Sequence, residues 1–377
     1  MNGLRIVLAD ADPAGLPAEV WLLKGLLIFT FVLHLFFMNA VLGGGLVWLW
    51  ASGHARRTAR PHAPASGPDG YGELAGAIGR LLPVTTAFAI TTGVAPLLFT
   101  QLLYGQLFYT SSVLMAWPWL AIVLLLLAGY YANYGIAYTR PTTGRALALG
   151  VASSALFLAI GFVFTNNMTL MLRPEQHAPL YFASDAGWHS NAGDLWVWPR
   201  FAHMLAGSMA ICGLVVAWIA RLHRRLDPRV AAWMGQRGAR LFGAATLAQF
   251  VVGVGFFFAL PVPVREVFEA GVTPDAILLV TGVAFALAAV VLVRRSLLLA
   301  SCAALVAVAD MAVVRHRVRT LLLEPYFQPE SLPVVPQTAP FVLFAVLLVA
   351  GLAVVGWMIW KFAAARPVEA PTDAAVS

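Results

Sequence analysis

Charged residues are scarce in this 377-residue chain: Asp, Glu, Lys and Arg make up 11% of it, whereas 60% of the residues are hydrophobic. About a quarter of a typical soluble domain is charged, so this deficit excludes an ordinary soluble protein. The apolar residues instead form long runs, such as 21–51, 241–260 and 339–360. Because runs of about twenty apolar residues span a bilayer, the composition predicts an integral membrane protein.

Cysteine is also rare. Cys212 and Cys302 each lie inside an apolar run, which excludes a disulfide framework, a paired-cysteine zinc site and a CxxCH motif for covalent haem. The net charge of +7 does not indicate a nucleic-acid partner, since the arginines gather at the ends of apolar runs.

A positively charged leader is missing as well. Residues 1–20 carry Asp10, Asp12 and Glu19, and the apolar stretch that follows is longer than the core of a signal peptide. We therefore expect the first helix to stay in the protein.

The apolar runs predict an all-α, polytopic membrane bundle, a single transmembrane domain over residues 1–377. The nine predicted spans are 21–51, 83–107, 113–138, 146–166, 200–220, 241–260, 275–293, 296–314 and 339–360. Only Arg294, Arg295 and Ser296 separate the seventh span from the eighth, so these two are either one bent element or two helices joined by a tight turn.

The distribution of basic residues predicts that the N-terminus is outside and the C-terminus inside. Sixteen of the 24 basic residues then lie on the inner side: Arg56, Arg57, Arg60, Arg80, Arg140, Arg145, Arg221, Arg224, Arg225, Arg229, Arg237, Arg240, Arg294, Arg295, Lys361 and Arg366. The cluster Arg315-His316-Arg317-Val318-Arg319 falls on the outer side, where either an anionic partner or lipid headgroups would hold it.

Two connections are long. The inner one, 52–82, is rich in Gly, Pro, Ser and Arg and predicts a flexible loop. The outer one, 166–199, mixes amides, methionines, aromatics and charges, so we expect it to fold over the outer face of the bundle.

Two histidines lie inside predicted spans, where an ionisable side chain costs roughly 3 kcal/mol and needs a reason. His34 precedes Gly43, Gly44 and Gly45, which would let another helix or a flat macrocycle approach the backbone. His203 precedes four small residues, Ala206, Gly207, Ser208 and Ala210. Each histidine is either an axial ligand of haem iron or an interhelical hydrogen-bonding group, and the presence of two favours ligation.

Asp310 is the one carboxylate deep in a predicted span. It would ligate iron, carry protons or pair with Arg315 or Arg317. Arg315, Arg317 and Arg319 suit haem propionates, because guanidinium groups bind carboxylates in a bidentate manner. Gln249 and the intramembrane asparagines are interpreted as groups that form hydrogen bonds between helices.

Three segments resemble subunit I of the bd-type quinol oxidases: TFVLHLFFMNAVLGGGLVWL, AFAITTGVAPLLFTQLLYGQLFY and WPRFAHMLAGSMAICGLVVAW. They are similar to the family's first, second and fifth helices. The resemblance implies that His34 ligates a haem of the high-spin pair and that His203 ligates the low-spin haem. It covers about the first 220 residues, and nine helices with the N-terminus outside are also the family's layout.

The sequence departs from that family at several positions. The family's second low-spin ligand is a methionine on helix seven, but residues 275–293 contain none; the helix-three glutamates are missing from 113–138. Asp310 is the nearest counterpart of the eighth-helix glutamate, and the quinol loop is reduced to PVPVREVFEAGVTP. These departures argue against a complete oxygen-reducing site. His203 then needs another partner, for which Met168, Met171 and His316 are candidates.

The sequence therefore predicts a haem-b-binding subunit of a quinol-linked oxidoreductase in a bacterial-type cytoplasmic membrane, with one to three haems. It would pass electrons between membrane quinone and a partner redox subunit, such as a cytochrome on the outer face. One alternative is a haem-free anchor for redox subunits. A transporter is the other, but its polar lining and internal repeats are not found in the sequence.

Overall fold

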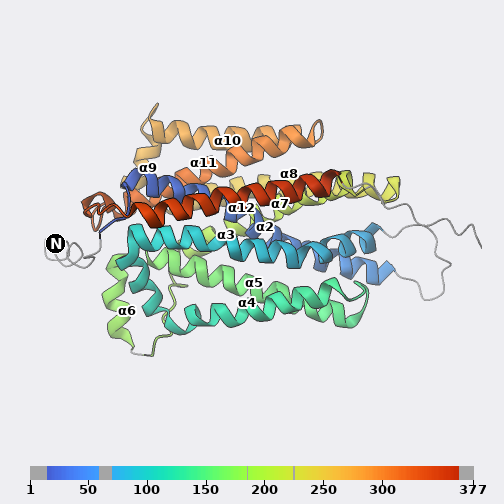
Figure 1. Ribbon diagram of the computed structural model, residues 1–377, viewed down its shortest axis with the longest axis horizontal. Coiled ribbons are helices and arrows are strands. Elements are labelled where there is room, and N and C mark those ends of the chain that lie inside the picture. The colour runs from blue at the N-terminus through green and yellow to red at the C-terminus, as the bar shows by residue number, and fades with distance from the viewer. Residues whose placement is uncertain (1–14, 59–69, 185, 224–225, 365–377) are drawn as a thin grey trace, which may run out of the picture.

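The computed structural model describes residues 15–58, 70–184, 186–223 and 226–364. Within this part of the chain the secondary structure is helical, apart from an isolated parallel bridge between Leu16 and Val334. Nine of the helices that it describes are long and apolar enough to cross a membrane, as predicted (Figure 1). They are α2 (Val20–Thr58), α3 (Gly70–Leu114), α4 (Ala116–Ala137), α5 (Gly144–Leu170), α7 (Val197–Leu222), α8 (Pro228–Ala259), α10 (Pro274–Leu292), α11 (Leu297–Leu323) and α12 (Thr338–Ala364).

The bundle has two ends that differ in structure. The short helices α6 (His177–Ala183) and α9 (Val262–Glu269) gather at one end, on the left of Figure 1, which we call the α6 end. The turn between α4 and α5 lies at the opposite end, which we call the Arg140 end. The 3-10 turns η1 (Pro174–Gln176) and η2 (Pro329–Ser331) follow α5 and α11, so they also belong to the α6 end.

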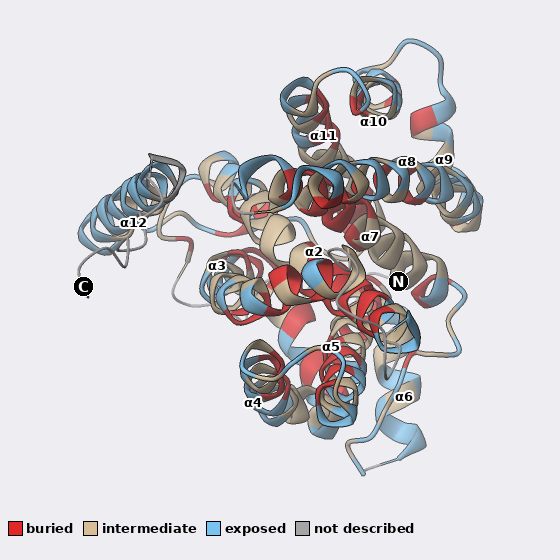
Figure 2. Ribbon diagram, turned by 90° about the vertical axis from the view of Figure 1, so that its right-hand side faces the viewer, coloured by how far each residue is buried: buried red, intermediate tan, exposed pale blue. Residues whose placement is uncertain are grey.

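The long helices pack as neighbouring pairs around a central pair, α2 and α3. Helices α2 and α3 lie in the middle of the molecule, with α4 and α5 on one side and α7 and α8 on the other, and α10 and α11 lie beyond α8 (Figure 2). Helix α12 stands at the edge with its apolar side chains exposed. The ring of its Phe344 lies 5.4 Å from that of Phe99 on α3.

The expected flexible loop at 52–82 is wrong in extent. Helix α2 continues to Thr58 and α3 begins at Gly70, and only 59–69 fall outside the described residues. These added turns carry an apolar face: Leu74 and Ile78 pack with Trp48 of α2 and Met234 of α8. That buried face keeps the segment helical despite its Gly-rich sequence.

Two other helices are longer than predicted. Helix α8 begins at Pro228, where the Asp227 side chain accepts a hydrogen bond from the Arg229 N–H and caps the helix. Helix α11 continues to Leu323 and so includes the cluster 315–319. The seventh and eighth spans are separate helices, and Ser296 caps the second of them by accepting a hydrogen bond from the Leu299 N–H.

Buried amide and hydroxyl groups join the helices. Asn133 of α4 donates to Thr86 of α3 and accepts from Ser153 of α5, at 3.1 and 2.6 Å. Ser208 of α7 donates to Asn39 of α2 at 2.8 Å. Inside a bilayer, such bonds give buried polar groups a hydrogen-bond partner, and they fix the register of one helix against another.

The connection 166–199 is held onto the α6 end by specific contacts. Arg173 pairs with Asp194 at 2.9 Å, and the Asn166 side chain accepts a hydrogen bond from the Asn191 N–H. The indole N–H of Trp196 donates to the carbonyl oxygen of Ala259, the last residue of α8. This connection therefore ties α5 to the start of α7 and the end of α8.

Candidate functional site

His34 is on α2, and its ring lies against α3. Its Nδ1 is 3.0 Å from the carbonyl oxygen of Ala89. A carbonyl oxygen only accepts, so Nδ1 carries the proton and Nε2 keeps its lone pair. The ring also lies directly over Gly93, where an added Cβ would be 2.9 Å from Cε1. This arrangement orients the imidazole as metal-ligating histidines are oriented, through the nitrogen that does not bind the metal.

The three consecutive glycines serve helix packing. A Cβ on Gly43 would be 2.1 Å from the backbone oxygen of Ser208 on α7. Gly44 faces Leu82 on α3, and Gly45 faces Ser154 on α5. Of the two readings that the sequence left open for these glycines, the described structure shows close approach of helices.

His203 lies between α7 and α8. The side-chain nitrogen of Gln249 is 3.4 Å from His203 Nε2, a long and weak contact. Nδ1 has no hydrogen-bond partner among the described residues although it is buried, and it faces Gly253 of α8. Neither ring nitrogen is engaged in a strong bond, so the ring is free to bind a ligand.

The two histidines lie at the same height in the bundle. Helices α2 and α7 run in the same direction, from the α6 end to the Arg140 end, and Asn39 contacts Ser208. His34 and His203 each precede this contact by five residues, which is about 7.5 Å along a helix. Both imidazoles are therefore about 7.5 Å nearer the α6 end than the contact.

Three arginines converge on the α6 side of the histidines. Arg200, Arg315 and Arg319 come from α7 and α11 and are close enough to repel one another. Arg315 lies over the ring of Phe31, at 4.4 Å, and Arg319 lies 5.1 Å from the ring of Tyr104. Arg319 is only 3% exposed.

No carboxylate among the described residues lies within salt-bridge distance of these three arginines. Buried like charges that repel one another are unfavourable unless an anion compensates them. Arg319 is buried, whereas Arg200 and Arg315 are half-buried. We call these three residues the buried arginine cluster, and it has the charge of an anion-binding site.

Arg317 and Asp310 occupy different surroundings. Arg317 points to α10 and binds Asp275, at 2.9 Å, so it is separate from the buried arginine cluster. Asp310 faces Gly282 of α10, and its Oδ2 is buried with no hydrogen-bond partner in the described part of the chain. The ion pair between Asp310 and Arg315 or Arg317, which the sequence allowed, is not formed among these residues.

His316 lies at the rim of the α6 end, among Lys24, Arg315, Arg319 and Glu330. Its Nδ1 has no partner among the described residues. Lys24 binds Glu330 and joins α2 to η2. Burial raises the pKa of the Glu330 carboxyl, but the hydrogen bond from Lys24 and the charge of its ammonium group lower it by more, so the net shift is downward.

Within the part of the chain that the structure describes, neither histidine belongs to a multidentate metal site. Among the described residues, no group of three or more His, Cys, Asp or Glu side chains is placed to hold a metal ion. Single histidines against glycines suit a metal that brings most of its own ligands, as the iron of haem does. The unpartnered nitrogen of His203, the lone pair of His34 and the buried arginine cluster all fit that group.

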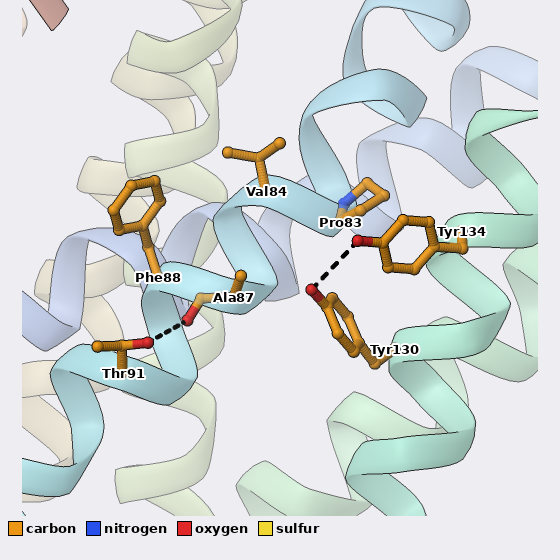
Figure 3. Close-up of a pocket in the computed structure, with 7 residues that line it drawn as sticks. All are labelled: Pro83, Val84, Ala87, Phe88, Thr91, Tyr130 and Tyr134. Carbon is orange, nitrogen blue, oxygen red and sulfur yellow. Dashed lines mark hydrogen bonds between the residues drawn. The ribbon is translucent and has the colours of Figure 1, made fainter. Parts of the chain in front are cut away.

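A shallow groove lies elsewhere, between α3 and α4 (Figure 3). It is lined by Pro83, Val84, Ala87, Phe88, Thr91, Tyr130 and Tyr134. The hydroxyl groups of Tyr130 and Tyr134 are 3.4 Å apart. Tyrosines near the end of a membrane helix commonly lie at the lipid headgroup level, and this position needs no further explanation.

Sequence reasoning missed Arg200, Gly93 and Gly253. Arg200 is three residues before His203 and one turn along the same face, which is a signal that the sequence does contain. The two glycines lie on α3 and α8, and no pattern in the sequence shows which glycine will face which histidine.

Comparisons with known proteins agree with the architecture. No protein-family model and no curated protein matches the sequence. The structure, however, is similar to that titled "The structure of bd oxidase from Geobacillus thermodenitrificans", with a TM-score of 0.66. The fold is that of a bd oxidase chain. The match covers 96% of this chain and 99% of that bd oxidase chain at 14% sequence identity, so the shared bd-oxidase fold extends over nearly the whole length.

Proposed function

We propose that this chain is a haem-b-binding membrane subunit of a quinol-linked electron-transfer complex, with the α6 end on the outer face of a bacterial-type cytoplasmic membrane. The observation that carries the proposal is the shared level of His34 and His203 beneath the buried arginine cluster. The bd-oxidase fold supports it. Bound haem would supply one-electron chemistry that the side chains lack.

The side chains have separate roles in this proposal. His34 Nε2 would bind iron while Ala89 holds its ring in place through Nδ1. His203 would bind a second iron between α7 and α8. The guanidinium groups of Arg200, Arg315 and Arg319 would bind propionates, and the apolar helices around them exclude water and lower the local dielectric constant.

Quinol would be oxidised near the α6 end, which releases its protons on the outer side and gives electrons to the haem. A partner redox subunit would then accept these electrons. The exposed apolar side chains of α12 and α4 are compatible with lipid or with another membrane subunit.

Quinol-driven reduction of the purified protein tests the proposal. A soluble quinol added to air-oxidised protein should reduce haem b, and the His34→Ala and His203→Ala variants should each lose part of the signal. His54→Ala is the matched control, because His54 belongs to the same helix but stacks on Tyr71 near the Arg140 end. If dithionite reduces the haem but quinol does not, the link to quinol is refuted. If the purified protein contains no haem, the haem-binding function is refuted and the role of a haem-free anchor subunit remains.

A further inference from the structure

The groove between α3 and α4 is long, narrow and mainly apolar. Its volume is about 270 Å³. From Pro83 to Thr91 it follows α3 for eight residues, which is roughly 12 Å. The hydroxyl group of Thr91 donates to the carbonyl oxygen of Ala87, so it is satisfied within the helix. Along α3 the groove therefore presents an apolar surface to a ligand.

The polar groups of the groove come from α4. Figure 3 shows the rings of Tyr130 and Tyr134 projecting from this helix, with their hydroxyl groups pointing toward each other. A contact between two hydroxyl groups uses one of their two protons, so the other proton can be donated to an oxygen atom outside the pair. The groove thus combines an apolar wall with a hydrogen-bond donor.

Two arginines lie near the end of the groove that is closer to the Arg140 end. Asn133 of α4 donates to Thr86 of α3, and this bond fixes the register of the two helices. Arg80 is six residues from Thr86 toward the Arg140 end, or about 9 Å along α3. In the same direction α4 ends at Ala137, and Arg140 follows in the turn. Both arginines are exposed at the level where α4 ends.

Both helices lead from the groove to these arginines. Arg80 precedes Val84 by four residues and so shares its face of α3. Its Nη1 would be 3.6 Å from a Cβ built on Gly76, so the guanidinium group points further toward the Arg140 end. On α4, the ring of Tyr138 stacks on that of Tyr134 at 6.4 Å and continues the row of aromatic rings toward the turn.

Positive charge is in excess at the Arg140 end. The acidic residues that the structure describes there are Glu73 and Asp227, and Asp227 caps α8. No ion pair within the described part of the chain involves Arg80 or Arg140. Basic sites between membrane helices on the cytoplasmic side bind anionic lipid headgroups, and the distribution of basic residues predicts that this end lies on that side.

From these positions we propose that the groove binds one anionic phospholipid. One acyl chain lies along α3 between Val84 and Thr91. The free phenol proton of the tyrosine pair is donated to an ester or phosphate oxygen of the lipid, and the guanidinium groups of Arg80 and Arg140 bind the phosphate. A lipid bound in this way joins α3 to α4 at a site that is independent of haem.

Native mass spectrometry of the delipidated full chain tests the headgroup. Dioleoyl phosphatidylglycerol and dioleoyl phosphatidylcholine have the same acyl chains but differ in charge, and the dissociation constant of the first bound lipid is measured for each. Phosphatidylglycerol should bind more tightly. Arg80→Gln should weaken its binding roughly five-fold and leave phosphatidylcholine unchanged. Arg294→Gln is the matched control, because Arg294 is an exposed arginine at the same end but precedes α11.

Two valines of α3 test the groove itself. Val84 lines the groove and Val94 does not, and each is 52% exposed. Val84→Trp should fill the groove and remove the tight binding of phosphatidylglycerol, whereas Val94→Trp should leave it unchanged. Tyr134→Phe keeps the ring but loses a hydroxyl group, and it should weaken the binding without affecting the fold.

Several results would overturn the proposal. Equal affinity for the two lipids refutes an anionic headgroup, and unchanged phosphatidylglycerol binding in Val84→Trp refutes the groove. Full competition by inorganic phosphate at millimolar concentration refutes a role for the acyl chain. Thermal unfolding without lipid shows whether each variant is folded, and Tyr134→Phe decides the test if Val84→Trp is not. Haem content does not enter these measurements, so their failure is distinct from failure of the proposed function.

Discussion

Ser208 and Asn39 join α7 to α2 through a hydrogen bond of 2.8 Å, and this contact sets His203 and His34 at one height. The register follows from close packing, because Gly43 allows the backbone of α7 to touch α2. Two histidines far apart in the sequence are thereby aligned beneath one buried arginine cluster.

Replacing Gly43 by alanine should destabilise the bundle. The new Cβ would be 2.1 Å from the Ser208 backbone oxygen, so α2 and α7 must separate. Overpacking of this kind costs about 1–3 kcal/mol. Thermal unfolding in detergent should show a lower midpoint for Gly43→Ala. Gly53→Ala in the same helix, with no atom within 4 Å of its Cβ, should not lower it; equal losses would contradict the packing account.

Gly93→Ala should disturb the first haem site specifically. Its Cβ would lie 2.9 Å from His34 Cε1 and push the ring away from Ala89. We expect a lower ratio of haem to protein with little change in yield. Gly253→Ala is the comparison at His203, where the nearest ring atom would be at an ordinary 3.5 Å. A normal haem content in Gly93→Ala would show that His34 need not keep this position.

Substitutions of Arg319 and Arg317 should differ in their effect on how tightly the protein retains haem. Arg319→Gln removes a buried charge that has no carboxylate partner among the described residues. The loss of a charge-assisted bond of about 1.5–3 kcal/mol should weaken haem retention roughly 10- to 160-fold. Arg317→Gln breaks the pair with Asp275 instead and should affect retention little. Haem transfer to apomyoglobin measures both rates, and similar rates in the two variants would argue against the buried arginine cluster.

The Lys24–Glu330 pair should weaken in acid. Because the pKa of Glu330 is lowered in the folded protein, its contribution is present above the ordinary value of 4.5 and is lost as the pH falls through the lower folded value. The Glu330 side chain is 55% exposed, so solvent screening reduces the effect to about 0.5 kcal/mol or less.

Unfolding midpoints of the parent and Glu330→Gln measure this effect. They should differ slightly at pH 7 and converge once the pH has fallen through the lowered pKa of Glu330. A difference that grows as the pH falls has the opposite sign and would rule out the pair as the cause.

The sequence predicts the number of membrane helices, because each is a long apolar run with polar ends. It misplaces helix ends where a span continues past the bilayer, as at Gly70 and Pro228, since helical turns outside the membrane are no longer marked by continuous apolarity. There, packing against Trp48 and Met234 decides the structure.

The candidate site is only partly predictable for a related reason. His34, His203 and Asp310 are conspicuous as polar groups in apolar runs, so burial costs alone identify them. Their neighbours are not conspicuous. That Arg317 binds Asp275 while Arg319 turns inward depends on which face of α11 each occupies after the helices have packed.

The pyridine haemochrome spectrum of the purified protein tests the central claim most directly. It identifies the haem type and counts haems per chain, without reliance on any partner subunit. The account predicts haem b, at least one per chain, with less in His34→Ala and in His203→Ala. A pure, folded protein with no Soret band would contradict it.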